Sequence, residues 1–299
     1  DVYKRQLWNS SDLFHGLIVI GMALWGTVIG AILGGLPTSH FGRKKTLLYI
    51  GYLYSISAIG SAICSDPVTF AFFRFIGGVG IGISTIAAPA YISEISASNE
   101  RGKLVGYYQL NIVVGILFAF VSNFFLKELG DSSWRLMVGI EAIPAIIYTI
   151  MIFYISQSPR WIFLNGDILK SENIYEKLFS TKEKEIFLKE ISGTRNKFQK
   201  NERIFKNKYR FILYLAFMIA FFNQFSGINA FLYYSPRIFQ EGGLGENSAF
   251  LSSIGIGVTN LIFTIIGISL IDKVGRKVLM ITGSIGYIIS LTFIFLSFL

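Results

Sequence analysis

Three amide side chains and two phenols gather within one otherwise apolar segment. They are Asn223, Gln224, Asn229, Tyr233 and Tyr234. In hydrocarbon an unpaired polar group costs free energy, so amides at membrane depth normally face protein or a water-filled cavity. An amide both donates and accepts hydrogen bonds, which suits a neutral polyol such as a sugar, and tyrosine offers a flat amphipathic surface for a sugar ring.

Gly227 lies between these amides and weakens the helix there, as in transporters whose binding sites lie at interrupted helices. Each sugar hydrogen bond contributes only about 0.5–1.5 kcal/mol net, so several groups must converge on one ligand. The alternative is that the amides join neighbouring helices to one another. The clustering of all five polar side chains favours a binding site.

The composition indicates a membrane protein. Of 299 residues, 53% are hydrophobic and only 15% are charged, and the mean hydropathy is +0.56. Soluble domains usually carry about 25% charged residues. A net charge of +9 could indicate nucleic acid. The basic residues lie in short loops between apolar spans, however, which is the positive-inside pattern, so no nucleic-acid partner is expected.

Eight apolar stretches are long enough to cross about 30 Å of hydrocarbon. They cover residues 13–36, 46–63, 67–92, 103–126, 134–156, 211–239, 248–271 and 278–298. Loops 37–45, 93–103 and 272–277 are basic and the intervening loops are mainly acidic, so the basic loops are predicted to be cytoplasmic. The long loop 157–210 mixes Lys and Glu and predicts short amphipathic helices on that face. A solvated linker is the alternative for about residues 195–208.

An internal repeat predicts the architecture. Gly42–Lys44 follows the first span and Gly275–Lys277 follows the seventh, with the same three residues in each. Six spans separate the copies, and an even number preserves orientation, as in transporters built from two parallel halves. The expected parent has twelve spans, of which this chain lacks the first and the last three. The predicted domains are an N-terminal bundle at 1–156, a cytoplasmic helical segment at 157–210 and the start of a C-terminal bundle at 211–299.

Glycines are spaced for close helix packing. Gly26, Gly30 and Gly34 lie four residues apart in the first span, on one small-residue face. Residues 77–82 hold four more glycines, and a nucleotide-binding loop is excluded because no soluble strand–turn–helix surrounds them. The sequence has no Walker lysine motif, no nucleophile–base pair and no metal-ligand spacing. We therefore expect no enzyme, no cofactor and no metal site.

Two ionisable residues lie inside spans. Arg74 and Glu141 are each about seven residues from the outer end of their span, which is roughly 10 Å deep. A charged side chain at this depth costs roughly a few kcal/mol unless it is paired or hydrated. Arg74 and Glu141 are therefore expected to pair with each other. A proton relay and a static ion pair remain equally open. Gln109 and Asn260 are further polar positions, for which helix–helix hydrogen bonding is the simpler interpretation when each is taken alone.

Motifs recur in order from about residue 16 to residue 299. They are Phe41-Gly42-Arg43-Lys44, Arg74 with residues 75–82, Pro89-Ala90-Tyr91-Ile92-Ser93-Glu94-Ile95, Arg101-Gly102-Lys103, Trp134-Arg135, Ile143-Pro144-Ala145, Ser158-Pro159-Arg160-Trp161, Gln224 to Tyr234, and Asp272 to Lys277. In this order they resemble the sugar porter family of the major facilitator superfamily. The resemblance implies an all-α, multi-pass membrane protein with two six-helix bundles in the parent, of which helices 2 to 9 are present here.

The resemblance also implies roles for individual residues. The expected sugar-binding residues are Gln109, Asn223, Gln224, Asn229, Tyr233, Tyr234 and Asn260. The expected proton-coupling residues are Arg74 and Glu141, matching the arginine and glutamate of bacterial symporters, whose first-helix acid would lie before residue 1. The expected cytoplasmic gate comprises Gly42, Arg43, Glu94, Arg101, Arg160, Asp272, Gly275 and Arg276.

The expected function is secondary active transport of a monosaccharide across the cytoplasmic membrane by alternating access, coupled to proton symport. The expected partners are a small-molecule sugar, protons and the lipid bilayer. The alternatives are a facilitative sugar or polyol carrier, a carrier of an organic ion, and a sugar sensor that does not transport. Thr38-Ser39-His40 and Gln157 depart from the family's charged residues, which predicts a weakened or rewired gate. Asn223 and Ile116 depart at positions that affect the choice of sugar.

Overall fold

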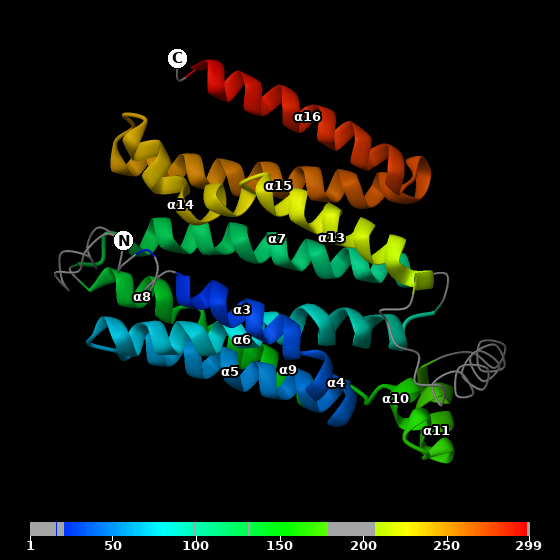
Figure 1. The fold of residues 1–299 in the computed structure, drawn as a ribbon. Helices are drawn as coiled ribbons and strands as arrows, with labels where there is room; N and C mark the ends of the chain where they lie inside the picture. The colour runs from blue at the N-terminus through cyan, green and yellow to red at the C-terminus, as the bar shows by residue number, and fades with distance from the viewer. Residues whose placement is uncertain (1–15, 17–20, 98–99, 131, 179–206, 298–299) are drawn as a thin grey trace. The chain divides into compact units, whose positions relative to one another are not determined.

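The computed structural model describes residues 16, 21–97, 100–130, 132–178 and 207–297, and every regular element within these ranges is helical (Figure 1). The helices are α3 (Gly21–Leu33), α4 (Gly35–His40), α5 (Arg43–Ile63), α6 (Pro67–Ile95), α7 (Arg101–Leu126), α8 (Ser133–Gly139), α9 (Ala142–Tyr154), α10 (Pro159–Leu164), α11 (Ile168–Leu178), α13 (Arg210–Phe225), α14 (Ile228–Glu241), α15 (Glu246–Val274) and α16 (Arg276–Ser297). A 3₁₀ turn, Asn207–Tyr209, precedes α13. The predicted all-α class is confirmed.

Seven helical segments of the described chain are long and apolar enough to cross a membrane, and α3 is a shorter apolar helix of 13 residues. These segments correspond to the predicted spans, which confirms a multi-pass membrane protein. Two of them are interrupted: α8 and α9 together form one span, and α13 and α14 form another. Much of the predicted first span before Gly21, and nearly all of the linker predicted at 195–208, lie outside the described residues.

The chain divides into two compact units. One comprises residues within Asp1–Leu104 and Ser122–Tyr233, and the other comprises Val105–Val121 and Tyr234–Leu299. The boundaries predicted from the sequence, at 156 and 210, remain a prediction. Each unit is described separately below.

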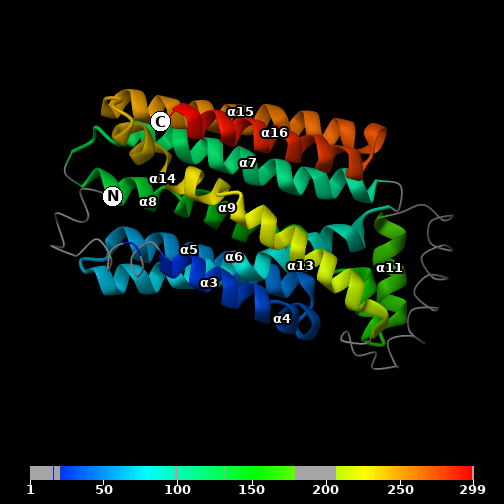
Figure 2. The same ribbon diagram turned by 45° about the horizontal axis from the view of Figure 1, so that its top comes forward.

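In the first unit α6 lies between α3 and α5, side by side with both (Figures 1 and 2). Glycines make this possible on both sides. A Cβ added at Gly26 or Gly78 would overlap backbone atoms of the facing helix, and one added at Gly77 would overlap the Ser57 hydroxyl of α5. The close packing predicted from the glycine spacing is therefore confirmed, with the glycines of α6 divided between two neighbours.

Helices α8 and α9 both pack on α5. The Thr149 side chain of α9 lies against Gly51, and the Cβ of Ala62 lies 3.1 Å from the position a Cβ would take at Gly139 of α8. A buried apolar cluster of Leu47, Ile50, Ala87, Tyr91 and Ile152 joins α5, α6 and α9. These contacts hold α5, α6, α8 and α9 in fixed register.

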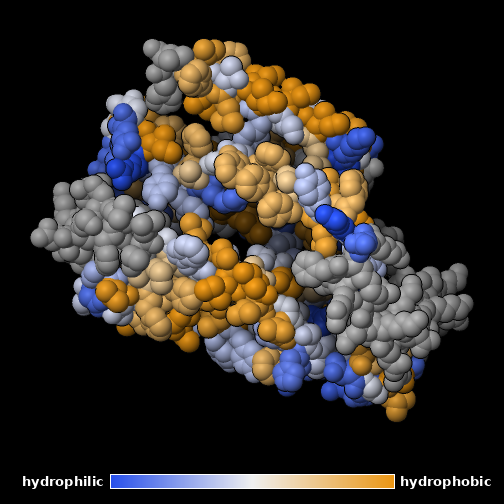
Figure 3. Space-filling model, in the orientation of Figure 1, coloured by the Kyte–Doolittle hydropathy of each residue, from blue (hydrophilic) through white to orange (hydrophobic). Residues whose placement is uncertain are grey.

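In the second unit α7 and α15 are antiparallel neighbours. Gly257 of α15 lies against Leu117 and Phe120 of α7, whereas Gly106, near the start of α7, lies against Ile268 further along α15. Helix α16 packs on α15. Hydrophobic residues cover most of the visible faces of α16 and of α3 (Figure 3), as expected of helices that meet lipid.

The internal repeat has the same backbone in both copies. Gly42 (φ 83°, ψ 163°) precedes α5, and Gly275 (φ 87°, ψ 151°) precedes α16. Essentially only glycine adopts this region, which explains why both copies carry glycine before their Arg-Lys pair. The conformational match is independent support for the repeat.

Candidate functional site

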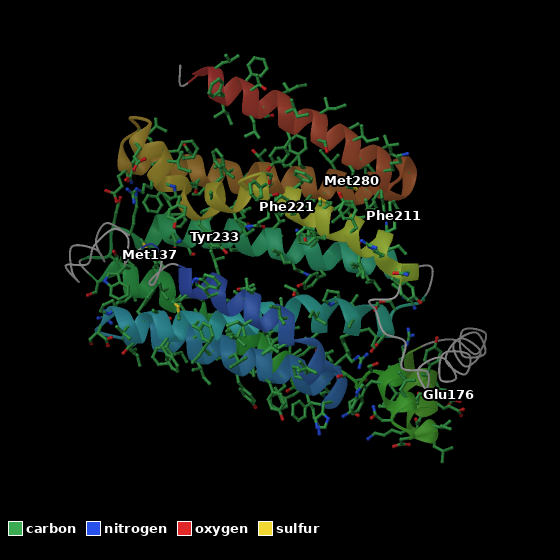
Figure 4. The ribbon with its side chains drawn as sticks, in the orientation of Figure 1. Met137, Glu176, Phe211, Phe221, Tyr233 and Met280 are labelled. Carbon is green, nitrogen blue, oxygen red and sulfur yellow. The ribbon has the colours of Figure 1, made fainter. Side chains whose placement is uncertain are left out.

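The polar stretch lies at a true interruption of its span. Helix α13 ends at Phe225 and α14 begins at Ile228, and Gly227 between them has a φ of 79°. The Ser226 amide N–H still donates to the Phe222 carbonyl, but the next N–H, of Gly227, donates only three residues back, to Gln224. The weakening predicted at Gly227 is confirmed, and Figure 4 shows Tyr233 on α14, beyond the break.

Two of the predicted sugar-binding amides meet across this break. The Asn229 Nδ2 donates to Gln224 Oε1 at 3.2 Å. Both of these amides keep further donors and acceptors, and Asn223 and Gln224 are exposed while Asn229 is half-buried. A polyol hydroxyl can replace this bond with one that it donates and one that it accepts.

The other predicted sugar-binding residues are distributed between the two units. Gln109 lies on α7 and Asn260 on α15, which are neighbouring helices of the second unit, and Tyr234 belongs to that unit as well. Asn223, Gln224, Asn229 and Tyr233 belong to the first unit. The convergence of all seven on one ligand therefore stays a prediction.

Arg74 and Glu141 form the expected ion pair. The Arg74 Nη1 lies 3.2 Å from Glu141 Oε2, with the side chains 30% and 54% exposed. Arg74 lies on α6, and Glu141 lies in the junction between α8 and α9. The predicted pairing is confirmed as geometry, whereas its role in proton coupling stays a prediction.

The chain tightens around Glu141 because of a proline three residues later. Pro144 has no N–H to donate to the Ile140 carbonyl, which instead accepts from Ile143 at 3.1 Å. The Glu141 N–H likewise donates three residues back, to Val138, at 3.3 Å. These two bonds, each three residues back, mark a local departure from α-helical geometry at the α8–α9 junction.

At the predicted cytoplasmic face, Glu94 accepts hydrogen bonds from two sides. Its Oε1 lies 2.7 Å from the Arg43 Nη2, and its Oε2 accepts from the Ser158 hydroxyl at 2.6 Å. The Glu94 side chain is only 7% exposed. These three residues, hereafter the Glu94 network, join the ends of α5, α6 and α10.

Trp161 and Ser158 belong to a motif noted in the sequence, but no role was predicted for either of them. The Trp161 Nε1 donates to the Ser39 carbonyl at 2.7 Å, and its ring covers Gly42. Ser158 also caps α10 by accepting from the Trp161 N–H. The Ser-Pro pair at 158–159 is a helix-start signal that could have identified the cap, since proline is favoured at the first helical position.

Two side chains bond to the backbone of the Thr38-Ser39-His40 segment, for which a weakened or rewired gate was predicted. Arg43 donates to the Thr38 carbonyl at 3.2 Å, and Trp161 donates to the Ser39 carbonyl. Both bonds use the backbone of the segment, so they do not require the family's acid or arginine at these positions.

The remaining gate residues are placed but not brought together. Arg101 is the first residue of α7 and Arg160 lies in α10, both in the first unit. Asp272 lies in α15, and Gly275 and Arg276 lie at the junction of α15 with α16, in the second unit. A gate formed from both sets stays a prediction.

Comparisons with known proteins agree on one family. The family model "Sugar (and other) transporter" matches residues 3–299. The D-xylose-proton symporter of Escherichia coli K12 is 33% identical over 91% of this chain, and the arabinose-proton symporter of Bacillus subtilis is 33% identical over 94%. Among solved structures, XylE bound to 6-bromo-6-deoxy-D-glucose has a TM-score of 0.81 at 29% identity over 92% of this chain and 65% of its own.

The fold is that of a multi-pass helical membrane protein. The chain belongs to the family of sugar (and other) transporters. It spans about 60% of the length of the curated relatives, 60% of the xylose symporter and 62% of the arabinose symporter. Since this is a family of transporters, the chain is not an enzyme, as predicted.

Proposed function

We propose that the complete protein carries a monosaccharide across the cytoplasmic membrane by alternating access, driven by the co-transport of protons. The observation that carries the proposal is the Arg74–Glu141 ion pair, whose charged atoms lie 3.2 Å apart inside membrane-spanning helices. The xylose- and arabinose-proton symporters among its relatives support the same assignment.

The pair offers a direct means of coupling. A proton from outside adds to the Glu141 carboxylate, cancels its charge and weakens its attraction to Arg74; the same proton leaves the carboxyl group on the inner side. In low-dielectric surroundings a neutral carboxyl group costs less free energy than a carboxylate, so protonation favours states in which Glu141 is shielded from water.

The sugar is proposed to bind at the interrupted span. Asn223, Gln224 and Asn229 present donors and acceptors where the helix is broken, and Tyr233 adds an aromatic face. Gln109, Tyr234 and Asn260 are proposed to be further sugar-binding residues. Because none of the seven side chains is charged at neutral pH, a neutral polyol fits the site better than an organic ion does.

The Glu94 network is proposed to hold the cytoplasmic ends of α5, α6 and α10 together during part of the transport cycle. Its contacts are charge-assisted hydrogen bonds that a buried carboxylate accepts, and such bonds are stronger than neutral ones. Opening the cytoplasmic side would require these contacts, or their counterparts near Arg276, to change partners.

The test is uptake of labelled hexoses and pentoses by vesicles that contain the complete protein, with and without a protonophore. Accumulation that collapses with the protonophore, and that is lost in Glu141→Gln but kept in the exposed control Glu128→Gln, supports symport. Uptake that equilibrates and ignores the protonophore would indicate a facilitator. Sugar binding without uptake would indicate a sensor.

A further inference from the structure

Trp134 and Arg135 are the second and third residues of α8, shortly before Glu141, and both side chains attach this end of α8 to other helices. The Arg135 Nη1 donates to the Ala62 carbonyl at 2.9 Å and to the Cys64 carbonyl at 2.6 Å. These carbonyls belong to the last turn of α5 and its C-cap, where a helix has unpaired acceptors and a partial negative charge. A guanidinium there is a strong and directional partner.

Trp134 makes the second attachment. Its ring is 7% exposed and lies edge-on to Phe70 of α6, with the ring centroids 6.2 Å apart. Trp134, Phe70 and Cys64 form a buried apolar cluster, with Val138 of α8 packed against it. The Arg135 guanidinium lies 4.6 Å from the Trp134 ring, so the two attachments support each other.

The Trp134–Phe70 contact and the Arg74–Glu141 pair join the same two elements at successive levels. Phe70 and Arg74 are four residues apart on α6 and therefore share a face. Trp134 and Glu141 are seven residues apart, about two helical turns. Residue numbers increase in the same direction along both elements. The Trp134–Phe70 contact and the Arg74–Glu141 pair are therefore successive contacts between them.

The Arg74–Glu141 pair depends on the Trp134–Phe70 contact because the span is interrupted at Glu141. The 3₁₀ bonds at Glu141 and Ile143, forced by Pro144, separate α9 from α8 at this point. Glu141 is joined to α8 by the bond from its N–H to the Val138 carbonyl, and to α9 by the bond from the Ala145 N–H to its own carbonyl. The position of the Glu141 carboxylate therefore depends on α8, which has only seven residues, as well as on α9.

We propose that Trp134 and Arg135 are positioning residues for the Arg74–Glu141 pair. By fixing the start of α8 to the end of α5 and to Phe70, they place the Glu141 carboxylate within reach of Arg74. The inference rests on the proposed function in one respect, that the pair takes part in transport.

The test is a double-mutant cycle in the complete protein, with Arg135→Met, Glu141→Gln and the combination of both. The readout is the rate of sugar exchange between vesicle and medium per monodisperse protein, which needs no proton gradient. We expect Arg135→Met to slow exchange in the parent and to have little further effect in Glu141→Gln, with a coupling factor of at least about threefold. Equal fold-losses in both backgrounds would overturn the proposal.

A second readout is the pH profile of proton-driven uptake. Arg135→Met is expected to shift the midpoint of the profile, and Arg135→Lys to restore part of the shift. The control Arg237→Met removes an exposed arginine that pairs with Glu241 at 2.9 Å, and should change neither readout. A parent-like profile in Arg135→Met contradicts the proposal.

Two further points keep the result interpretable. If Arg135→Met yields no monodisperse protein, Arg135→Lys and Trp134→Phe take its place in the same cycle. If uptake by the parent ignores a protonophore, proton coupling fails, and the exchange cycle alone then decides whether Trp134 and Arg135 act through Glu141.

Discussion

Alanine at Gly42 should destabilise the protein more than alanine at Gly275, although the two glycines have nearly the same backbone angles. Both lie where φ exceeds 80° and ψ exceeds 150°, a region that costs a non-glycine residue about 1–3 kcal/mol. That strain is common to both substitutions. The surroundings differ, since a Cβ at Gly275 meets nothing within 4 Å.

At Gly42 the new methyl group would meet the Trp161 ring at 2.9–3.0 Å from three of its atoms. The ring is held by its hydrogen bond to the Ser39 carbonyl, so it cannot move away without losing that bond. Overpacking of this kind typically costs about 1–3 kcal/mol. The expected total is therefore roughly 2–6 kcal/mol for Gly42→Ala against about 1–3 kcal/mol for Gly275→Ala.

The assay is thermal unfolding of the complete protein in detergent, for both glycine variants and for Gly42→Ala combined with Trp161→Ala. In the Trp161→Ala background, Gly42→Ala should lower the free energy of unfolding only by the backbone strain, which is the loss expected for Gly275→Ala. Equal melting temperatures for the two single variants, or a cost at Gly42 that persists without Trp161, would refute the reasoning.

Three other outcomes follow from the described contacts. Ser158→Ala removes both the α10 cap and a bond to the Glu94 carboxylate, so thermal unfolding should show a loss of about 1–3 kcal/mol in stability. The control Ser39→Ala, whose exposed hydroxyl donates to the nearby Leu36 carbonyl, should change stability little. Equal losses in the two variants would contradict the Glu94 network. Asn229→Ala should raise the sugar KM up to about tenfold, with Asn247→Ala as an unaffected control, and an unchanged KM would remove Asn229 from the site. Hydrogen bonds from Thr69, first from its side chain and then from its backbone, lower the pKa of Asp66 at the start of α6, so this carboxylate contributes stability above its unfolded pKa and loses it as pH falls through the lower folded value. Asp66→Asn should therefore flatten the stability profile below about pH 4, and an unchanged acid limb would exclude this cap as its source.

The sequence allowed the membrane class and the helical fold to be predicted because span length and glycine spacing depend on local pattern. The Arg74–Glu141 pair was predictable for a similar reason: two opposite charges at the same depth in hydrocarbon have few alternatives to pairing. The break at Gly227 was also readable, because glycine is the residue that reaches a φ of 79° without strain.

What could not be predicted depends on contacts between distant segments. Nothing near Trp161 in the sequence indicates that its indole meets the Ser39 carbonyl 122 residues away. The partners of Arg135 are backbone carbonyls, which every residue has, so no residue type marks them. The 3₁₀ segment at Glu141 was overlooked, although Pro144 was a sufficient signal for it.

The backbone contact between α3 and α6 has a consequence for proton leakage across the membrane. At Gly26, Gly30, Gly78 and Gly82 there is no room even for a methyl group, so there is none for a water molecule either. Because no chain of water molecules fits between α3 and α6 at these positions, protons cannot pass along this contact. If the complete protein is the proton-driven carrier proposed above, these glycines help to prevent protons from leaking across the membrane without sugar.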